Sequence, residues 1–188
     1  DSPQEGPGAT LDAAGLYLCP GLIDCHVHFF WDAGPNPRLT YLDSDGEKRL
    51  ECARRNARIA IQAGITTMRD CAAPAPLIFE FQRQAARDDF LAPHIISCGR
   101  ALMRPEGHCH FMGGEVRTVE EVRRLSTEHL EQGAGFVKLM ASGGGMTPGT
   151  VPHEADLPLQ LMQAAAEVAR AHGVHITAHC HATESIER

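Results

Sequence analysis

Long hydrophobic runs are missing from this sequence. Pro, Gly, Asp or His interrupts every apolar stretch within a few positions, and none approaches the roughly 18 residues that a transmembrane helix needs. A basic segment followed by an apolar one is also missing at the beginning, so we expect no secretory signal in these 188 residues. We therefore expect a cytoplasmic protein with no membrane partner, although a sequence that begins at Asp1 rather than Met leaves an upstream segment open.

An excess of positive charge is missing as well. Lys and Arg number 17 against 24 Asp and Glu, and the formal net charge is −7 with His neutral. This balance lacks the electrostatic attraction to phosphates on which nucleic-acid binding depends. We therefore expect no nucleic-acid partner and turn to a small molecule instead.

Paired cysteine spacings are the third absence. The seven cysteines are odd in number, form no CxxC motif, and several lie within apolar, strand-like runs. This pattern is typical of small buried side chains in a reducing compartment rather than of a disulfide framework or a zinc ribbon. With 43% hydrophobic and 22% charged residues, the composition is that of a globular protein.

Short apolar runs alternate with amphipathic segments along the chain. The predicted strands are 22–30, 65–69, 94–98, 135–140 and 174–178, and the predicted helices are 44–63, 76–88, 118–132 and 157–172. Alternation of this kind predicts parallel strands joined by right-handed crossovers, with ligand chemistry at the C-terminal ends of the strands. Histidines follow several of these strands, so we examine them first.

Two histidines alternate at the end of the first predicted strand. His26 and His28 project to the same side, because side chains alternate across a strand. Two imidazoles that converge in this way make a ready pair of metal ligands, and Asp24 on the same face would orient one of them. Taken alone, the pattern fits two histidines that merely end a strand equally well.

A lysine lies within the fourth predicted strand. Lys138 is the middle residue of the apolar run 136–140, where an ammonium group is costly unless it is paired or neutralised. It is therefore either a salt-bridge partner or a reactive group. Glycines at 143–145 would let a ligand approach the backbone closely, although an ordinary loop explains them as well.

The alternating histidine pattern recurs twice. His179 and His181 follow the fifth strand, and His108 and His110 lie in the glycine-rich loop after the third strand. Histidine pairs and a lysine at several ends of one parallel sheet are hard to arrange by chance. The other histidines are expected to be surface or structural residues: His94, His129, His153, His172 and His175.

The motifs in this order resemble a known family. Residues 20–28, PGLIDCHVH, resemble the PGxIDxHxH signature of the amidohydrolase superfamily, and residues 64–70, GITTMRD, resemble its GITTxRD segment. Residues 136–144 and the loop 107–114 are similar to the branch that contains imidazolonepropionase-like proteins and metal-dependent Xaa-Pro dipeptidases. The resemblance runs from about residue 10 to the end and is more specific for the superfamily than for the substrate.

The resemblance implies an α/β fold, a partial (β/α)8 TIM-like barrel. Residues 1–19 would form the trailing edge of a flanking β-sandwich, and residues 20–188 would form strands one to five of an incomplete hydrolase barrel. A closed barrel takes about 250 residues, and the family's later histidine and aspartate, after strands six and eight, are not in this sequence. We therefore expect a piece of an enzyme, with an open five-stranded sheet.

The resemblance also implies a set of metal ligands. His26 and His28 would bind the more buried metal, and His179 would bind the second. Lys138 would be carboxylated to a carbamate that bridges the two metals, which removes the buried positive charge and makes the lysine a catalytic residue. Nitrogen and oxygen donors suit one or two Zn²⁺ ions, and Mn²⁺, Co²⁺ or Fe²⁺ would also fit.

The remaining candidate residues would face the substrate. His181 would contact the substrate in catalysis or serve as an alternative ligand, and His108 and His110 would bind the substrate. The implied reaction is hydrolysis of a C–N bond in a dipeptide or N-acyl amino acid by a metal-activated hydroxide. The isolated chain would have reduced or no activity.

Two other functions stay open at this stage. The first is a non-catalytic barrel protein with a structural role, against which the intact set of candidate ligands speaks. The second makes Cys25, Cys109 or Cys180 a nucleophile, although alternation points each thiol away from the neighbouring histidines. The sequence leaves the oligomeric state open, a homo-oligomer included.

Overall fold

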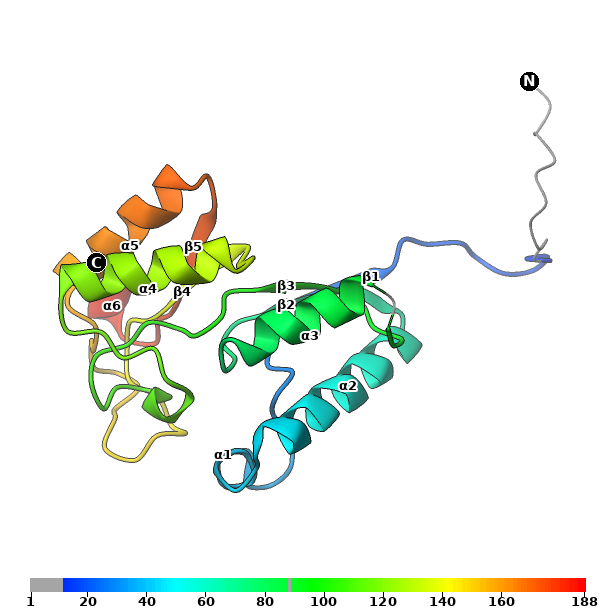
Figure 1. Ribbon diagram of the computed structural model, residues 1–188, viewed down its shortest axis with the longest axis horizontal. Coiled ribbons are helices and arrows are strands. Elements are labelled where there is room, and N and C mark those ends of the chain that lie inside the picture. Colours follow the sequence, from blue (N-terminus) through cyan, green and yellow to red (C-terminus); the bar gives the residue numbers. More distant parts are fainter. Residues whose placement is uncertain (1–11, 88) are drawn as a thin grey trace.

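A computed structural model describes residues 12–87 and 89–188, and strands and helices alternate along this part of the chain (Figure 1). The strands are β1 (Leu22–Val27), β2 (Ile65–Asp70), β3 (His94–Ser97), β4 (Phe136–Met140) and β5 (His175–His179). The helices are α1 (Pro37–Leu42), α2 (Gly46–Gln62), α3 (Leu77–Ala86), α4 (Val119–Glu131), α5 (Leu159–Ala171) and α6 (Thr183–Glu187), and a 3₁₀ turn covers His110–Met112. The predicted βα order is confirmed.

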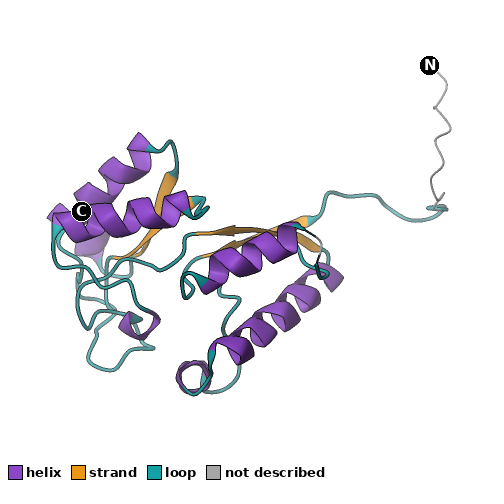
Figure 2. Cartoon of the chain, viewed as in Figure 1, coloured by secondary structure: helices purple, strands orange, loops and turns teal. Residues whose placement is uncertain are grey.

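The strands are parallel, but they form two sheets rather than the expected single one. Strands β1, β2 and β3 pair in that order, and β4 pairs with β5 (Figure 2). The ladder stops after β3, and the chain then passes through Gly99, whose φ is +72°. Three backbone hydrogen bonds still link β3 and the segment after it to the β4 region: Gly135 N donates to Ser97 O and Leu102 N to Lys138 O, each at 2.8 Å, and Met140 N donates to Leu102 O at 2.9 Å. The strand ends therefore stay close together.

Local capping sets where the helices begin. Helix α2 begins after Asp45, whose carboxylate accepts the Lys48 N–H at 2.9 Å, so it starts two residues later than the predicted residue 44. Helix α4 begins after Thr118, as predicted, because its hydroxyl accepts the Glu121 N–H at 3.2 Å. Helices α2 and α3 pack on β2 and β3, and α5 packs on β4, β5 and α4.

Burial differs sharply between the strands. Every residue of β4 is buried, whereas Leu22 and Ile23 of β1 are 61% and 67% exposed. One core cluster surrounds Phe79 and Phe81 of α3, and a second surrounds Leu139. The chain between β3 and α4 therefore crosses from one core to the other.

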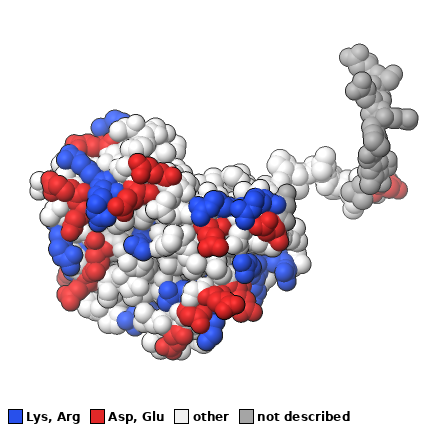
Figure 3. Space-filling model, viewed as in Figure 1, with Lys and Arg blue, Asp and Glu red and all other residues white. Residues whose placement is uncertain are grey.

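The outer surface carries both signs of charge. Lys and Arg are mixed with Asp and Glu over the helices on the face that Figure 3 shows. Exposed ion pairs join Arg123 to Glu167 at 3.0 Å and Arg124 to Glu128 at 2.8 Å. Within residues 12–87 and 89–188, no helix has the length and apolar character needed to cross a bilayer.

The predicted β-sandwich edge is not tested by the structure. Residues 12–21 contain no strand and lead away from the strands and helices (Figure 1). Residues 1–11 lie outside the described part of the chain. The division at residue 19 therefore stays a prediction.

Candidate metal centre

A cavity of about 170 Å³ lies where β1, β4 and β5 end. Its lining residues are His26, His28, Trp31, His108, Cys109, Met112, Lys138, Met140, Met146 and His179. All four predicted metal ligands are in this lining, and the parallel topology explains why, because the C-terminal ends of parallel strands meet at one edge. Two larger hollows, one lined by α1, α2 and the loop after β1 and the other by α4 and α5, share no residue with this lining.

The histidines at the end of β1, His26 within the strand and His28 directly after it, are placed as neutral donors. The His26 and His28 rings lie 5.4 Å apart between centres. His28 Nδ1 lies 3.2 Å from the Ala72 carbonyl, which can only accept, so the proton is on Nδ1 and the lone pair is on Nε2. Burial lowers the pKa of His28 to about 4, and burial together with Lys138 lowers the pKa of His26. Both rings are therefore in the form that binds metals.

Lys138 is buried without a partner of opposite charge. Its exposed fraction is 2%, and no hydrogen bond or ion pair of residues 12–87 and 89–188 involves its side chain. Burial lowers the pKa of the amine, which favours its neutral form. The sequence left two interpretations of Lys138, a salt-bridge partner or a reactive group. The structure does not support the first, so the second remains.

His179 and His108 face each other across the same cavity. The His179 Nε2 donates to the Gly143 carbonyl at 3.1 Å, which leaves Nδ1 with its lone pair. The His108 ring stacks on His179 at 4.7 Å between centres, and its buried Nδ1 has no hydrogen-bond partner among the described residues. Burial, with His179 second, lowers the pKa of His108 to about 4. The cavity thus gathers four imidazoles in two neighbouring pairs.

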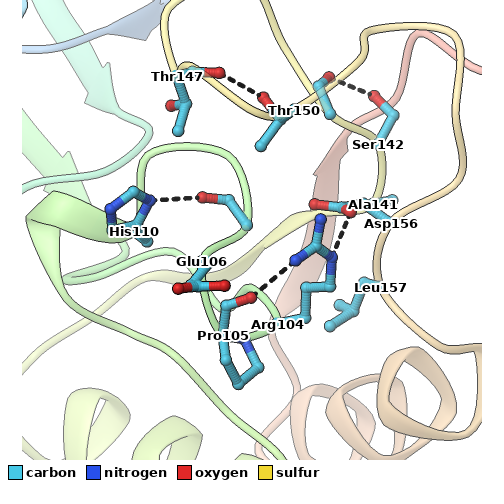
Figure 4. Close-up of polar contacts among 12 residues, drawn as sticks. Arg104, Pro105, Glu106, His110, Ala141, Ser142, Thr147, Thr150, Asp156 and Leu157 are labelled. Atoms are coloured by element: carbon cyan, nitrogen blue, oxygen red, sulfur yellow. Dashed lines mark hydrogen bonds and ion pairs between the residues drawn. The ribbon is translucent and has the colours of Figure 1, made fainter.

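The loops after β3 and β4 are tied together beside the cavity (Figure 4). Arg104 of the first loop forms an ion pair with Asp156 of the second and also donates to the Pro105 carbonyl at 2.8 Å. The Cys109 N–H donates to the Thr147 hydroxyl at 2.8 Å. These contacts hold His108 against the strand ends.

The glycine run after β4 has a packing role. A Cβ on Gly144 would lie 2.3 Å from His108 Cε1, and one on Gly143 would lie 2.3 Å from the Val151 carbonyl oxygen. Any larger residue would displace the ring or the loop. The interpretation of Gly143 and Gly144 as part of an ordinary loop is therefore incomplete. A Cβ on Gly145, in contrast, would meet nothing within 4 Å.

Two candidate residues lie outside the cavity lining. His110 Nδ1 donates to the Gly107 carbonyl at 3.1 Å, within its own turn (Figure 4). His181 is exposed, although its ring lies 4.5 Å from that of His179 and its N–H donates to the Ser142 hydroxyl. Their predicted contacts with substrate stay predictions.

The cysteines are poorly suited to a nucleophilic role. Cys109 lines the cavity, but burial raises the pKa of its thiol to about 11. Burial also raises the pKa of Cys180, and Cys25 is exposed and outside the lining. A protonated thiol is a weak nucleophile, so the structure offers no support for this alternative.

Several lining residues escaped sequence reasoning. Trp31 and Met146 lie in irregular loops, where no spacing rule predicts a direction for the side chain.

Asp70, which is not in the cavity lining, also escaped sequence reasoning. It ends the GITTMRD segment and is fully buried beside His28, with a pKa that burial raises to about 7. The sequence motif includes Asp70, but its spacing does not predict which residues this side chain contacts.

The donor set is incomplete as the chain stands. Among the described residues, no three His, Cys, Asp or Glu side chains are arranged to hold a metal ion. The cavity instead offers neutral histidines and one buried amine, which becomes an oxygen donor only after carboxylation. The residues present therefore fit part of a divalent metal site.

Comparison with known proteins shows which chains and structures this one is similar to. Ochratoxinase from Aspergillus niger is 28% identical over 200 residues, covering 90% of this chain and 40% of that protein. Its crystal structure matches with a TM-score of 0.78, 26% identity and coverage of 89% and 44%. A prolidase complexed with N-methylphosphonate-L-proline matches with a TM-score of 0.84, 24% identity and coverage of 99% and 49%, which shows the same fold.

These matches fix the relation between the chain and its relatives. The chain spans less than half the length of the proteins that it matches. The neighbours are TIM-barrel proteins, so the fold is a partial α/β barrel. A family model described as the amidohydrolase family matches residues 17–188, and the chain therefore belongs to the amidohydrolase family.

Proposed function

We propose that this chain is part of a metal-dependent hydrolase that cleaves C–N bonds of the amide or peptide type. The observation that carries the proposal is the convergence of His26, His28, Lys138 and His179 on one cavity at the strand ends. The residues come from three different strands, and catalytic residues of barrel enzymes are placed in this way. Family membership supports the same reaction class.

The residues that line the cavity determine which cations would bind there. His26 and His28 would supply nitrogen donors for one cation, and His179 would supply one for a second. A bound divalent cation would lower the pKa of a water molecule and polarise a carbonyl group. Imidazole with an oxygen donor favours Zn²⁺, and Mn²⁺, Co²⁺ or Fe²⁺ would also fit.

Lys138 would supply the oxygen donor after carboxylation. The neutral amine nitrogen attacks the carbon of CO₂, an N–C bond forms, and a proton leaves the nitrogen for solvent. The lysine then carries a negative carbamate in place of a neutral amine. Its burial and lowered pKa support this step, because only the neutral amine is a nucleophile.

The substrate would be a dipeptide or an N-acyl amino acid. Two of the similar structures are a Xaa-Pro dipeptidase and a prolidase, which favours a dipeptide class. His108 has an unpartnered Nδ1 in the cavity lining and is therefore the substrate contact that we favour. His110 and His181 would reach the substrate only from outside this lining.

Hydrolysis of a dipeptide and N-acyl amino acid panel tests the proposal. Turnover with Zn²⁺ or Mn²⁺ is measured for this chain and for the longest natural reading frame that contains it. We expect low activity from the chain alone, and metal-dependent activity from the longer protein that Lys138→Ala reduces to background. The matched control is His175→Ala, an exposed histidine at the other end of β5.

Two results would contradict the proposal. Normal turnover by the isolated chain would show that the site is complete without further residues. Activity that survives a chelator and the Lys138→Ala change would show that neither a metal nor this amine takes part.

A further inference from the structure

Asp70 is a buried carboxylate that the proposed reaction does not use. It ends β2, its exposed fraction is 0%, and no ion pair within residues 12–87 and 89–188 includes it. Its two oxygens accept backbone N–H groups instead, from Phe29 at 2.8 Å and from Ala72 at 3.1 Å. Burying a carboxylate without a cation is costly, so the presence of this side chain here calls for an explanation.

Both hydrogen bonds border His28. Phe29 is the next residue along the chain, so one carboxylate oxygen fixes the peptide group that follows His28. The other oxygen holds the N–H of Ala72, whose carbonyl accepts the His28 Nδ1–H at 3.2 Å. The backbone on one side of the ring and the acceptor on the other are thus held by the same side chain.

Asp70 extends the pairing of β1 with β2 beyond its last residues. The ladder ends with Val27 opposite Asp70, and the Cys71 N–H donates to the Val27 carbonyl at 2.9 Å. At Phe29, a side-chain oxygen of Asp70 accepts the backbone N–H in place of a strand carbonyl. A side chain can therefore set the direction of His28 at a point where regular strand pairing has stopped.

We propose that Asp70 is a positioning residue that holds His28 as the Nδ1–H tautomer, with the Nε2 lone pair left for a divalent cation. The part about the cation rests on the proposed function, whereas the part about the tautomer stands on the hydrogen bonds alone. A carbonyl accepts only a protonated nitrogen, so the position of Ala72 decides which nitrogen of His28 keeps its lone pair. Partners of this kind commonly fix the orientation of metal-binding histidines.

Nuclear magnetic resonance of the metal-free protein tests the tautomer directly. The chain is labelled with ¹⁵N in histidine and kept with a chelator at about pH 8.5, above the raised pKa of Asp70. Two-bond ¹H–¹⁵N correlations assign the proton of each ring. We expect His28 in the wild type to be a single Nδ1–H species. We expect a mixture of tautomers in Asp70→Asn, because a carboxamide can accept one of the two N–H groups but turns its own NH₂ toward the other.

The control is Asp156→Asn, which changes another largely buried carboxylate near the cavity. It should leave the His28 signals unchanged. A wild-type His28 that is protonated on Nε2, or a pure Nδ1–H signal in Asp70→Asn, would overturn the inference. A wild-type His28 that is protonated on Nε2 overturns the inference even where Asp70→Asn does not fold.

Zinc affinity separates this inference from the proposed function. We expect Asp70→Asn to weaken Zn²⁺ binding about 10- to 100-fold, the usual effect of removing a group that orients a ligand. If His28→Ala leaves Zn²⁺ binding unchanged while the tautomer still depends on Asp70, the metal site is wrong and the tautomer inference stands. If the tautomer is independent of Asp70, the inference fails whatever the zinc result.

Discussion

Strands β4 and β1 both carry residues of the candidate site, but they are held in different ways. All five residues of β4 are buried, and the strand has neighbours on both sides, β5 and the segment at Leu102. Strand β1 pairs with β2 alone among the described residues, and Leu22 and Ile23 are largely exposed. In a closed barrel every strand has two neighbours, so β1, like β5 at the other end, has an incomplete environment among the described residues.

The difference shows how one site can be built with unequal support. Lys138 is fixed by the packing of its own strand, whereas His28 depends on individual hydrogen bonds beyond the end of β1. The neighbouring Asp70 carboxylate supplies a tie of that kind at the end of β2. We therefore expect changes in β4 to act through stability and changes around β1 to act through the geometry of the site.

A matched pair of leucine substitutions gives the largest expected contrast. Leu139→Ala on β4 removes a side chain that is 2% exposed and should cost about 2–5 kcal/mol of unfolding free energy. Leu22→Ala on β1, where the side chain is 61% exposed, should cost less than about 0.5 kcal/mol. Urea denaturation of both variants measures the difference. Equal losses would show that the exposed face of β1 is covered in solution.

A buried histidine at the junction of the two sheets should make stability depend on pH. His129 packs against Phe79 and the turn at Gly99, and burial lowers its pKa to about 4. The unfolded chain therefore binds a proton between pH 6.5 and 4 that the folded chain excludes, and this residue's contribution falls as the pH falls, by about 1.4 kcal/mol per unit.

The His129→Gln variant isolates this contribution. Asp70, whose pKa is raised by burial, acts with the opposite sign, so the difference between wild type and variant is measured rather than the wild-type curve alone. We expect the stability advantage of the wild type to shrink between pH 6.5 and 4 in urea titrations. A constant difference over that range would show that His129 is accessible to protons in the folded state.

The glycines after β4 provide a smaller and more local contrast. Gly144→Ala should displace the His108 ring and cost about 1–3 kcal/mol, because the new Cβ overlaps Cε1. Gly145→Ala meets nothing within 4 Å and should be close to neutral. Thermal unfolding gives the stabilities, and the His108 ring signals report the displacement. Identical spectra for the two variants would exclude the predicted contact.

The ion pair between the two loops should matter more than an ion pair on the helices. Arg104→Ala leaves the Asp156 carboxylate, 9% exposed, without its partner and should cost about 1–3 kcal/mol. Arg123→Ala breaks an exposed pair with Glu167 and should cost no more than about 1 kcal/mol. Denaturation at low and high salt compares them, and similar small losses would mean that the loops are held by other contacts.

Sequence patterns predicted the elements that have regular periodicity. Helix α4 and its Thr118 cap follow from local chemistry, and so do the strands that end in histidines. Helix α1 was missed because six residues are too few to show an apolar stripe. The break between β3 and β4 was missed because the pairing of distant strands depends on tertiary packing, which no local pattern specifies.

The site was predictable where strand alternation fixes the direction of a side chain. Lys138 and His179 lie in regularly paired strands and line one cavity with His26 and His28. The register of β1 shifts between Asp24 and Val27, and His28 follows the end of this strand, so alternation is a weaker guide there. His108 and His110 lie in an irregular loop, where alternation gives no direction, and only His108 lines the cavity. The contacts of Asp70 join residues about 40 positions apart, which no local pattern specifies.

Zinc content of the purified chain, dialysed with and without bicarbonate, tests the central claim most directly. If the four side chains share a cation site that includes a carboxylated lysine, the wild type and the His175→Ala control should retain zinc, and bicarbonate should increase the amount. Lys138→Ala and His28→Ala should retain much less, and bicarbonate should have no effect on Lys138→Ala. Zinc retained equally by the wild type and Lys138→Ala, or by neither, would contradict the account.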